Sequence, residues 1–210
     1  TSIFFVAIDL ARDRTWRGMY FKVTIAEGHP RFEAVQSPLP PRPMISASYL
    51  LALHAYAASR NLDVAAVQAE HDIDLQTELT ADGNISCIAF ARLIEKLADA
   101  GRDEAFGLHF VEQLPPRPGG VFHHIVFNSR TLRDAFQGIS RFLGLVTDAF
   151  TIAYQEDEDA GWLVFDFPPE LSTYAQFMDG QTALIALRAR ELLGADCAPY
   201  QVDLTRPHPH

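Results

Sequence analysis

Cysteine is scarce in this chain of 210 residues, because Cys87 and Cys197 are its two thiols and lie far apart. So low a count is more typical of a reducing compartment than of a disulfide framework. Long apolar runs are also missing: the longest, such as Ile3–Ile8, hold too few residues to span a bilayer. No basic stretch precedes Ile3–Leu10 and no small-residue cleavage site follows it, so a signal peptide is not visible. We therefore expect a cytoplasmic protein without a membrane partner.

Positive charge is in deficit, since 17 lysines and arginines face 27 aspartates and glutamates for a net charge of −10. A chain this acidic lacks the positive field that holds a phosphate backbone, so we expect the chain itself to bind nucleic acid poorly. Apolar residues make up 48% of the sequence and charged residues 21%. This composition predicts a sizeable hydrophobic core and argues against wholesale disorder.

A proline-rich segment, Ser37–Pro43, gives the clearest internal boundary. Its prolines remove backbone donors and favour extended structure, so neither a helix nor a central strand runs through it. Residues 1–43 carry six basic and four acidic side chains, whereas residues 44–210 carry 11 and 23. We predict that residues 1–43 are an N-terminal extension of unknown role, with a tail, a fusion remnant and a mis-assigned start as open interpretations. Residues 44–210 form the functional domain.

Hydrophobic periodicity and capping residues predict helices first and strands later. Asp63, Asn84 or Ser86, and Thr131 are candidate helix caps, because their side chains can accept from the free amides of a first turn. Helices are expected over residues 46–60, 63–71, 86–101, 104–113, 121–127, 131–148 and 170–194. Strands are expected over 2–8, 19–26, 31–36, 150–155, 161–167 and 200–205. The fold class is α+β: a helical N-terminal part followed by a small, mostly antiparallel sheet with packed helices.

Catalytic and metal-binding motifs are absent from the sequence. The eight histidines include no His-Glu-x-x-His, and the chain has no Cys-x-x-Cys and no Gly-x-Ser-x-Gly. His123 and His124 are adjacent, so on a helix they lie about 100° apart and do not easily share a metal ion. The acidic run 156–159 lacks the alternation of a calcium loop and is typical of a solvated hairpin tip. We expect no catalytic residue, no metal and no cofactor, and hence a protein that is not an enzyme.

Four segments, in this order and spacing, resemble a known family: Phe106–Phe110 (FGLHF), Pro118–Phe122 (PGGVF), Ser129–Phe136 (SRTLRDAF) and Arg141–Leu143 (RFL). The family is the AraC/XylS group of bacterial transcriptional regulators, and the similar part is its arabinose-binding-type N-terminal domain. The resemblance extends from Ser46 to the last residue.

This resemblance implies a domain that senses a small-molecule effector and forms a homodimer. In the family, a C-terminal domain with two helix-turn-helix motifs binds DNA, and that domain is absent from this chain. DNA is therefore expected as a partner only through the absent C-terminal domain, and the acidic charge of the chain agrees with this. Residues 1–43 have no counterpart in the resemblance.

The effector pocket is expected among the aromatic-rich helices and the hairpin, because ligand sites combine apolar walls with a few polar groups. For each aromatic candidate, core packing is the alternative interpretation, and Arg141 is either a partner for a ligand carboxylate or a surface charge. The candidate ligand-binding residues are Phe110, Phe122, His123, Arg141, Tyr154 and Trp162.

Three other functions stay open at this point. An enzyme, such as a hydrolase, would hold a nucleophile and a base in contact within a cleft. A haem- or lipid-sensing α+β domain would turn an axial histidine, His109 or His123, toward a cavity of porphyrin size. A pure dimerisation module would use the long helix 170–194 as its partner face.

Overall fold

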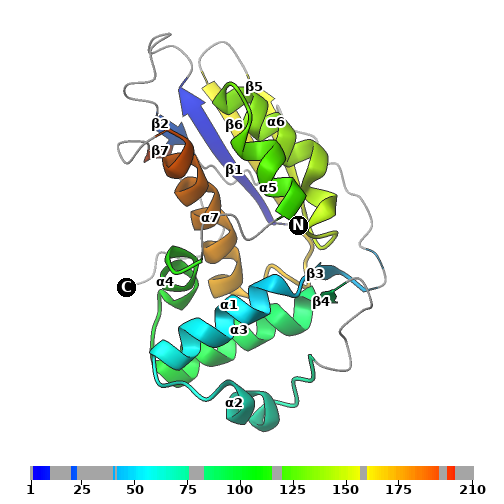
Figure 1. The fold of residues 1–210 in the computed structure, drawn as a ribbon, viewed down its shortest axis with the longest axis vertical. Helices are drawn as coiled ribbons and strands as arrows, with labels where there is room; N and C mark the ends of the chain where they lie inside the picture. Colours follow the sequence, from blue (N-terminus) through cyan, green and yellow to red (C-terminus); the bar gives the residue numbers. More distant parts are fainter. Residues whose placement is uncertain are drawn as a thin grey trace.

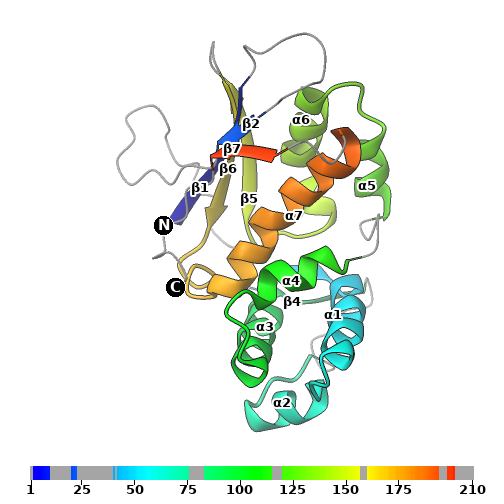
Figure 2. The same cartoon turned by 90° about the vertical axis from the view of Figure 1, so that its left-hand side faces the viewer.

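The computed structural model describes residues 2–9, 20–22, 40, 42–75, 83–114, 120–156, 160–193 and 198–201. Its elements form a helical half and a sheet half, and helix α7 (Ala175–Leu193) runs from one to the other (Figures 1 and 2). The predicted α+β fold with a mostly antiparallel sheet is confirmed, whereas the predicted order is only partly right, because two strands of the sheet, within residues 2–22, precede the helices in the chain.

The helical half packs its helices beside a short antiparallel ribbon. Its elements are β3 (Met44–Ser46), α1 (Ser48–Ser59), α2 (Val64–Glu70), β4 (Asn84–Ser86), α3 (Cys87–Gly101) and α4 (Phe106–Glu112). Ile45 pairs with Ile85 at the centre of the ribbon, and both side chains are buried. Periodicity did not predict this ribbon, because strands of three residues are too short to show an alternating pattern.

The predicted helix caps are found in the structure. Asp63, Ser86 and Thr131 each accept a hydrogen bond from the backbone amide three residues later, at 3.0 to 3.2 Å. Of the two candidates for α3, Ser86 is the cap, since Asn84 lies within β4. Each cap satisfies one of the amides that the first turn of a helix leaves without a backbone partner.

The larger sheet has five strands in the order β5-β6-β1-β2-β7. All neighbours are antiparallel except β2 and β7, which are parallel. The strands are β1 (Ser2–Asp9), β2 (Tyr20–Lys22), β5 (Thr151–Glu156), β6 (Ala160–Phe167) and β7 (Ala198–Gln201). The predicted hairpin is β5 and β6, which pair along all of β5 with Ile152 opposite Phe165.

The strands expected near the N-terminus lie in this sheet. β1 pairs with β6 along all eight of its residues, and β2 pairs with β1. The strand expected over residues 31–36 and the end of the strand expected over 200–205 lie outside the described residues. The domain boundary at residues 43 and 44 stays a prediction.

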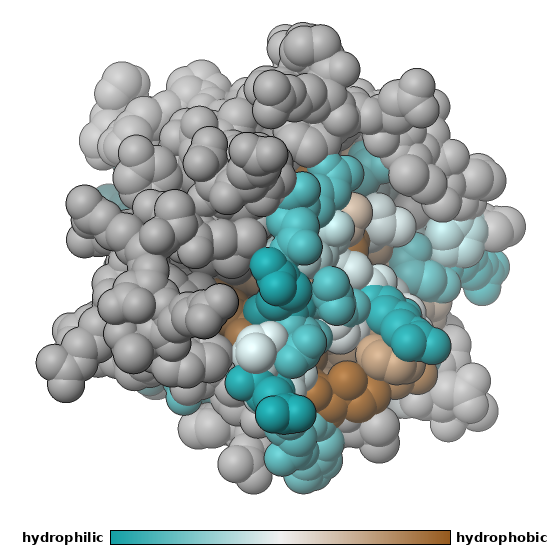
Figure 3. Space-filling view, turned by 90° about the horizontal axis from the view of Figure 1, so that it is seen from above, coloured by the Kyte–Doolittle hydropathy of each residue, from teal (hydrophilic) through white to brown (hydrophobic). Residues whose placement is uncertain are grey.

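Helices α5 (Gly120–Phe127) and α6 (Leu132–Phe142) lie against the sheet half, and the 3₁₀ helix η1 (Leu143–Leu145) follows α6 (Figure 1). The α6 residues predicted to line one face are buried, whereas Arg133 and Gln137 on the other face are exposed. Seen from above, hydrophilic side chains form a band across the described surface, beside a small hydrophobic area (Figure 3). Among the described residues, no helix is both long and apolar enough to cross a membrane.

The helix expected to close at Asp148 ends earlier than predicted, because the segment after η1 pairs with β3 instead. Ser46 donates its backbone N–H to the Val146 carbonyl at 3.1 Å, and Thr147 forms a β-bridge with Ile45. The amide of Met44 donates to Asp148 Oδ1 at 2.6 Å. This pairing attaches the ribbon of the helical half to the sheet half.

Helix α7 is held at its N-terminus by a carboxylate from the helical half. Glu95, on α3, accepts hydrogen bonds at Oε1 from the backbone amides of Gln176 and Phe177, at 2.6 and 3.3 Å. A negative group at this position also interacts favourably with the helix dipole. The expected start of this helix at Glu170 is corrected to Ala175, since turns occupy residues 169–173.

Replacing Glu95 by glutamine is expected to lower the free energy of unfolding by about 1 kcal/mol, because the charged acceptor at the start of α7 becomes neutral. Urea denaturation followed by circular dichroism measures this change. The matched control is Glu70→Gln, since Glu70 is exposed at the end of α2. A midpoint for Glu95→Gln that equals the control midpoint contradicts the capping role.

Candidate functional site

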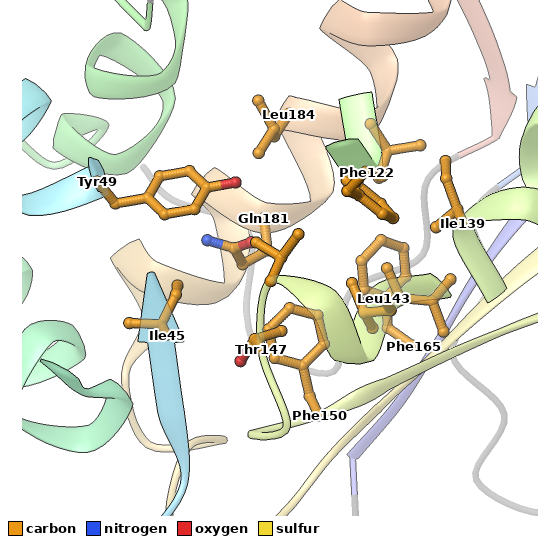
Figure 4. A pocket seen from close by; sticks show the side chains of 13 residues that line it. Ile45, Tyr49, Phe122, Ile139, Leu143, Thr147, Phe150, Phe165, Gln181 and Leu184 are labelled. Atoms are coloured by element: carbon orange, nitrogen blue, oxygen red, sulfur yellow. The ribbon is translucent and has the colours of Figure 1, made fainter. Parts of the chain in front are cut away.

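A cavity of about 40 Å³ lies where the two halves meet, between the sheet, helices α5–α7 and the β3–α1 segment (Figure 4). Segments far apart in the sequence form its wall, because Ile45 and Tyr49 come from the helical half whereas Ile152 and Phe165 come from the sheet. The lining residues are Ile45, Tyr49, Phe122, Ile139, Leu143, Val146, Thr147, Phe150, Ile152, Phe165, Gln181, Leu184 and Ile185. We call this space the central cavity.

Among its described residues, the wall of the central cavity is apolar except for Tyr49, Thr147 and Gln181. The Thr147 hydroxyl is already used by the fold, because it donates to the Met44 carbonyl at 2.7 Å and accepts from the Ala149 amide at 3.1 Å. Within the described part of the chain, no hydrogen bond engages the side chain of Tyr49 or of Gln181. Figure 4 shows these two polar ends on the same side of the cavity, beside α7.

The Tyr49 hydroxyl stays protonated over the physiological range. Only 7% of Tyr49 is exposed, and this burial raises the pKa of its phenol, while the positive charge of Arg188 acts in the opposite direction. Arg188 is itself buried on α7 and forms an ion pair with Glu191. A protonated phenol both donates and accepts, so Tyr49 can bind either kind of polar group on a ligand.

Of the four sequence-predicted site residues whose side chains the structure describes, Phe122 lies at the wall of the central cavity. Phe110 is buried in the helical half, with its ring 6.0 Å from the ring of Tyr56. Arg141 is exposed on α6, with its guanidinium 5.3 Å from the ring centre of Phe142.

The other three candidates lie on α5 and on the β5–β6 hairpin. Tyr154 packs its ring 6.2 Å from that of Phe136 and donates its hydroxyl to Glu156 Oε2 at 2.7 Å. Arg133 donates to the same oxygen at 2.7 Å. The side chains of His123 and Trp162 lie outside the described residues. A ligand contact by any of the six stays a prediction.

Tyr154, Glu156 and Arg133 form a hydrogen-bonded cluster in which the pKa values of Tyr154 and Glu156 are both shifted. Burial and the hydrogen bond to Glu156 raise the pKa of Tyr154 to about 12. The same hydrogen bond, together with Arg133, lowers the pKa of Glu156. The phenol therefore remains neutral and the carboxylate charged across the physiological range. The charged Glu156 on β5 accepts from Arg133 on α6, and this hydrogen bond connects the two elements.

Sequence reasoning missed Tyr49 and Gln181, the two polar side chains that the cavity wall leaves for a ligand. Tyr49 lies in a helix rich in leucine and alanine. Gln181 lies in a long helix whose apolar stripe indicates core packing rather than ligand binding. A signal was present in the second case: buried polar positions recur along α7 at Gln176, Asp179 and Thr182. Such a pattern is unusual for a helix that packs on a core.

Other reactive groups are placed where they serve the fold. His109 is half-exposed and contacts Asp103 Oδ2 through Nδ1 at 2.8 Å, so it lies at the surface rather than at the central cavity. Arg60 approaches the same carboxylate at 3.6 Å. Cys87 is fully buried, and this burial raises the pKa of its thiol, which makes it unreactive. Within the described ranges, no three histidine, cysteine or acidic side chains cluster as metal ligands do.

Comparison with known proteins identifies a family to which most of this chain is similar. The family model for the arabinose-binding domain at the N-terminus of AraC transcription regulators matches residues 62–210, well over half of the chain. The match includes α2 to β7 and hence most of the wall of the central cavity. No curated protein matches the chain.

Proposed function

Because this chain belongs to the family of AraC-type arabinose-binding domains, we propose that its central cavity binds a small-molecule effector and that binding is relayed to a DNA-binding domain. The family is one of ligand-sensing regulatory domains. The observation that carries the proposal is the apolar cavity at the junction of the two halves, with Tyr49 and Gln181 on its wall. Ligand sites in proteins combine apolar walls with a few polar groups in this way.

Helix α7 is the element that can report the presence of a ligand. It contributes Gln181, Leu184 and Ile185 to the wall of the central cavity. Toward its N-terminus, Gln176 accepts from the Gly107 amide at 2.9 Å and donates to the Glu104 carbonyl at 2.7 Å. A ligand that displaces α7 would therefore alter its hydrogen bonds to Gly107 on α4 and to Glu95 on α3. The size of this response is limited by the difference in ligand affinity between the two arrangements.

We further propose a second copy of the chain as partner, a cytoplasmic location, and access to DNA only through the DNA-binding domain of the regulator. The free thiol of Cys87 supports a reducing compartment. Helix α7 is buried along most of its length, so it offers little surface to a partner. Leu145 is 62% exposed on η1, and it supports a dimer contact there.

Filling the central cavity is expected to abolish effector binding. Leu184 is buried in the cavity wall, so Leu184→Trp places a larger side chain in the space that the ligand occupies. The measurement is thermal stabilisation of the chain across a metabolite library. A ligand at about 100 times its Kd stabilises the native protein by about 2.7 kcal/mol. We expect a shift for the native chain and no shift for Leu184→Trp.

The matched control is Leu51→Trp, which adds the same side chain on the exposed face of α1. It is expected to retain the shift of the native chain. A library without any stabilising compound contradicts the sensing function, and a shift that survives Leu184→Trp places the binding site elsewhere.

A further inference from the structure

We propose that the effector is a small, uncharged, mainly apolar molecule with one hydrogen-bonding group, which Tyr49 and Gln181 hold together. This inference rests on the proposed sensing function and specifies the chemistry of the ligand. It is carried by the composition of the cavity wall, by the two polar groups on it, and by the elements from which they come.

The first argument is charge. None of the thirteen described lining residues is ionisable near neutral pH, since the wall holds aliphatic and aromatic side chains, one threonine and one glutamine. A charged ligand would lose its hydration on entering this space without gaining a partner of opposite charge, which is strongly unfavourable. Arg188 does not supply that partner, because Glu191 already pairs with it. The described part of the wall therefore selects against carboxylates, phosphates and amines.

The second argument is the number of polar partners. Thr147 is satisfied by Met44 and Ala149, which leaves Tyr49 and Gln181 to meet the polar atoms of a ligand. A sugar carries hydroxyls all around its ring, and most of them would face aliphatic carbon. Each buried hydroxyl without a partner is unfavourable, so the wall selects against polyols. A molecule with one polar end suits it.

The third argument is where the two polar groups come from. Tyr49 belongs to α1 in the helical half, and Gln181 belongs to α7. A ligand group that bonds to both connects α1 to the helix that crosses both halves (Figure 4). Binding of the polar end thus also affects the position of α7 relative to α1. An apolar molecule without a polar end fills the cavity but does not connect the two helices.

The size of the cavity indicates how the ligand enters. An engineered cavity of about 150 Å³ binds benzene, and the central cavity measures about 40 Å³. An aromatic ligand must therefore enlarge it. Phe122, Gln181 and Ile185 are half-buried, whereas most of the wall is fully buried, so the mouth lies between α5 and α7. Separation of these two helices admits the ligand.

The experiment is calorimetric titration of the 210-residue chain with five probes. Phenol and indole represent the proposed class, benzene lacks the polar group, benzoate adds a charge, and L-arabinose is a polyol. We expect phenol and indole to bind, benzene to bind about tenfold more weakly, and benzoate and L-arabinose not to bind.

A variant of the chain tests the role of the Tyr49 hydroxyl directly. Tyr49→Phe is expected to weaken phenol binding about tenfold and to leave benzene binding unchanged, because only the hydroxyl is removed. The matched control is Tyr56→Phe, since this buried tyrosine lies further along the same helix and outside the cavity wall. Its ring packs against Phe106 and Phe110 instead, so the control is expected to bind both probes as the native chain does.

The outcomes separate this inference from the function on which it rests. Binding of benzoate or L-arabinose that Leu184→Trp abolishes overturns the ligand class and leaves the sensing function standing. Equal losses of phenol and benzene affinity in Tyr49→Phe, or no binding of phenol and indole, overturn the inference as well. The sensing function fails only if the metabolite library also yields no stabilising compound.

Discussion

Gly107→Ala is expected to lower the free energy of unfolding by about 3 kcal/mol or more, because no space exists for a side chain at this position. A Cβ atom on Gly107 would overlap the backbone oxygen of Gln176 and lie 2.8 Å from its carbonyl carbon. Both are backbone atoms, so no rotamer change relieves the clash. Helix α4 would have to move away from α7 and lose the hydrogen bond from the Gly107 amide to Gln176.

The matched control for this prediction is Gly144→Ala. A Cβ atom on Gly144 has nothing within 4 Å, and the residue is exposed on η1. This substitution is expected to change stability by no more than about 0.5 kcal/mol, or to stabilise slightly by restricting the unfolded chain. Urea denaturation of both variants measures the difference. Equal midpoints for the two variants contradict the close packing of α4 on α7.

The contact at Gly107 also matters for the proposed relay. Gly180 faces it on α7, where a Cβ atom would lie 3.1 Å from the Gly107 carbonyl oxygen. Two helices without side chains at their crossing approach closely. A small movement of α7 toward α4 would therefore displace α4 as well. The next residue along α7, Gln181, lines the central cavity. The central cavity and this close contact between α4 and α7 are thus adjacent.

Local features of the fold could be predicted from the sequence because each depends on neighbouring residues. The caps at Asp63, Ser86 and Thr131 need only a hydroxyl or carboxylate three residues before a free amide. The buried face of α6 follows from spacing alone, and so does the β5–β6 hairpin. The order of four short motifs was enough to predict the family, which the match over residues 62–210 confirms.

The central cavity could not be predicted in the same way, because its wall is assembled from segments more than a hundred residues apart. Ile45 of β3 lies on this wall together with Gln181 of α7, and β3 pairs with the segment that follows η1. Sequence reasoning selected residues by type, and it placed Phe122 correctly on α5. It also selected Phe110, which the structure places in the core of the helical half.

Phe177 connects the two halves through contacts between aromatic rings. It is fully buried on α7, and its ring meets those of Phe90 on α3, Phe150 and Phe167, with centres 6.3 to 6.5 Å apart. The three contacts are edge-to-face, which is a favourable arrangement of aromatic rings. Removal of the ring eliminates packing contacts with both halves. It also leaves a cavity that the neighbouring aromatic rings do not fill.

Phe177→Ala is therefore expected to lower the free energy of unfolding by about 3 to 5 kcal/mol, and Phe177→Leu by no more than about 1.5 kcal/mol, because leucine keeps most of the volume. Leu51→Ala truncates a large side chain that is 76% exposed on α1, and it is expected to cost no more than about 0.5 kcal/mol. Denaturation monitored by circular dichroism gives all three values. A cost below about 1 kcal/mol for Phe177→Ala contradicts the role of this ring, since both halves would then be held together by other contacts.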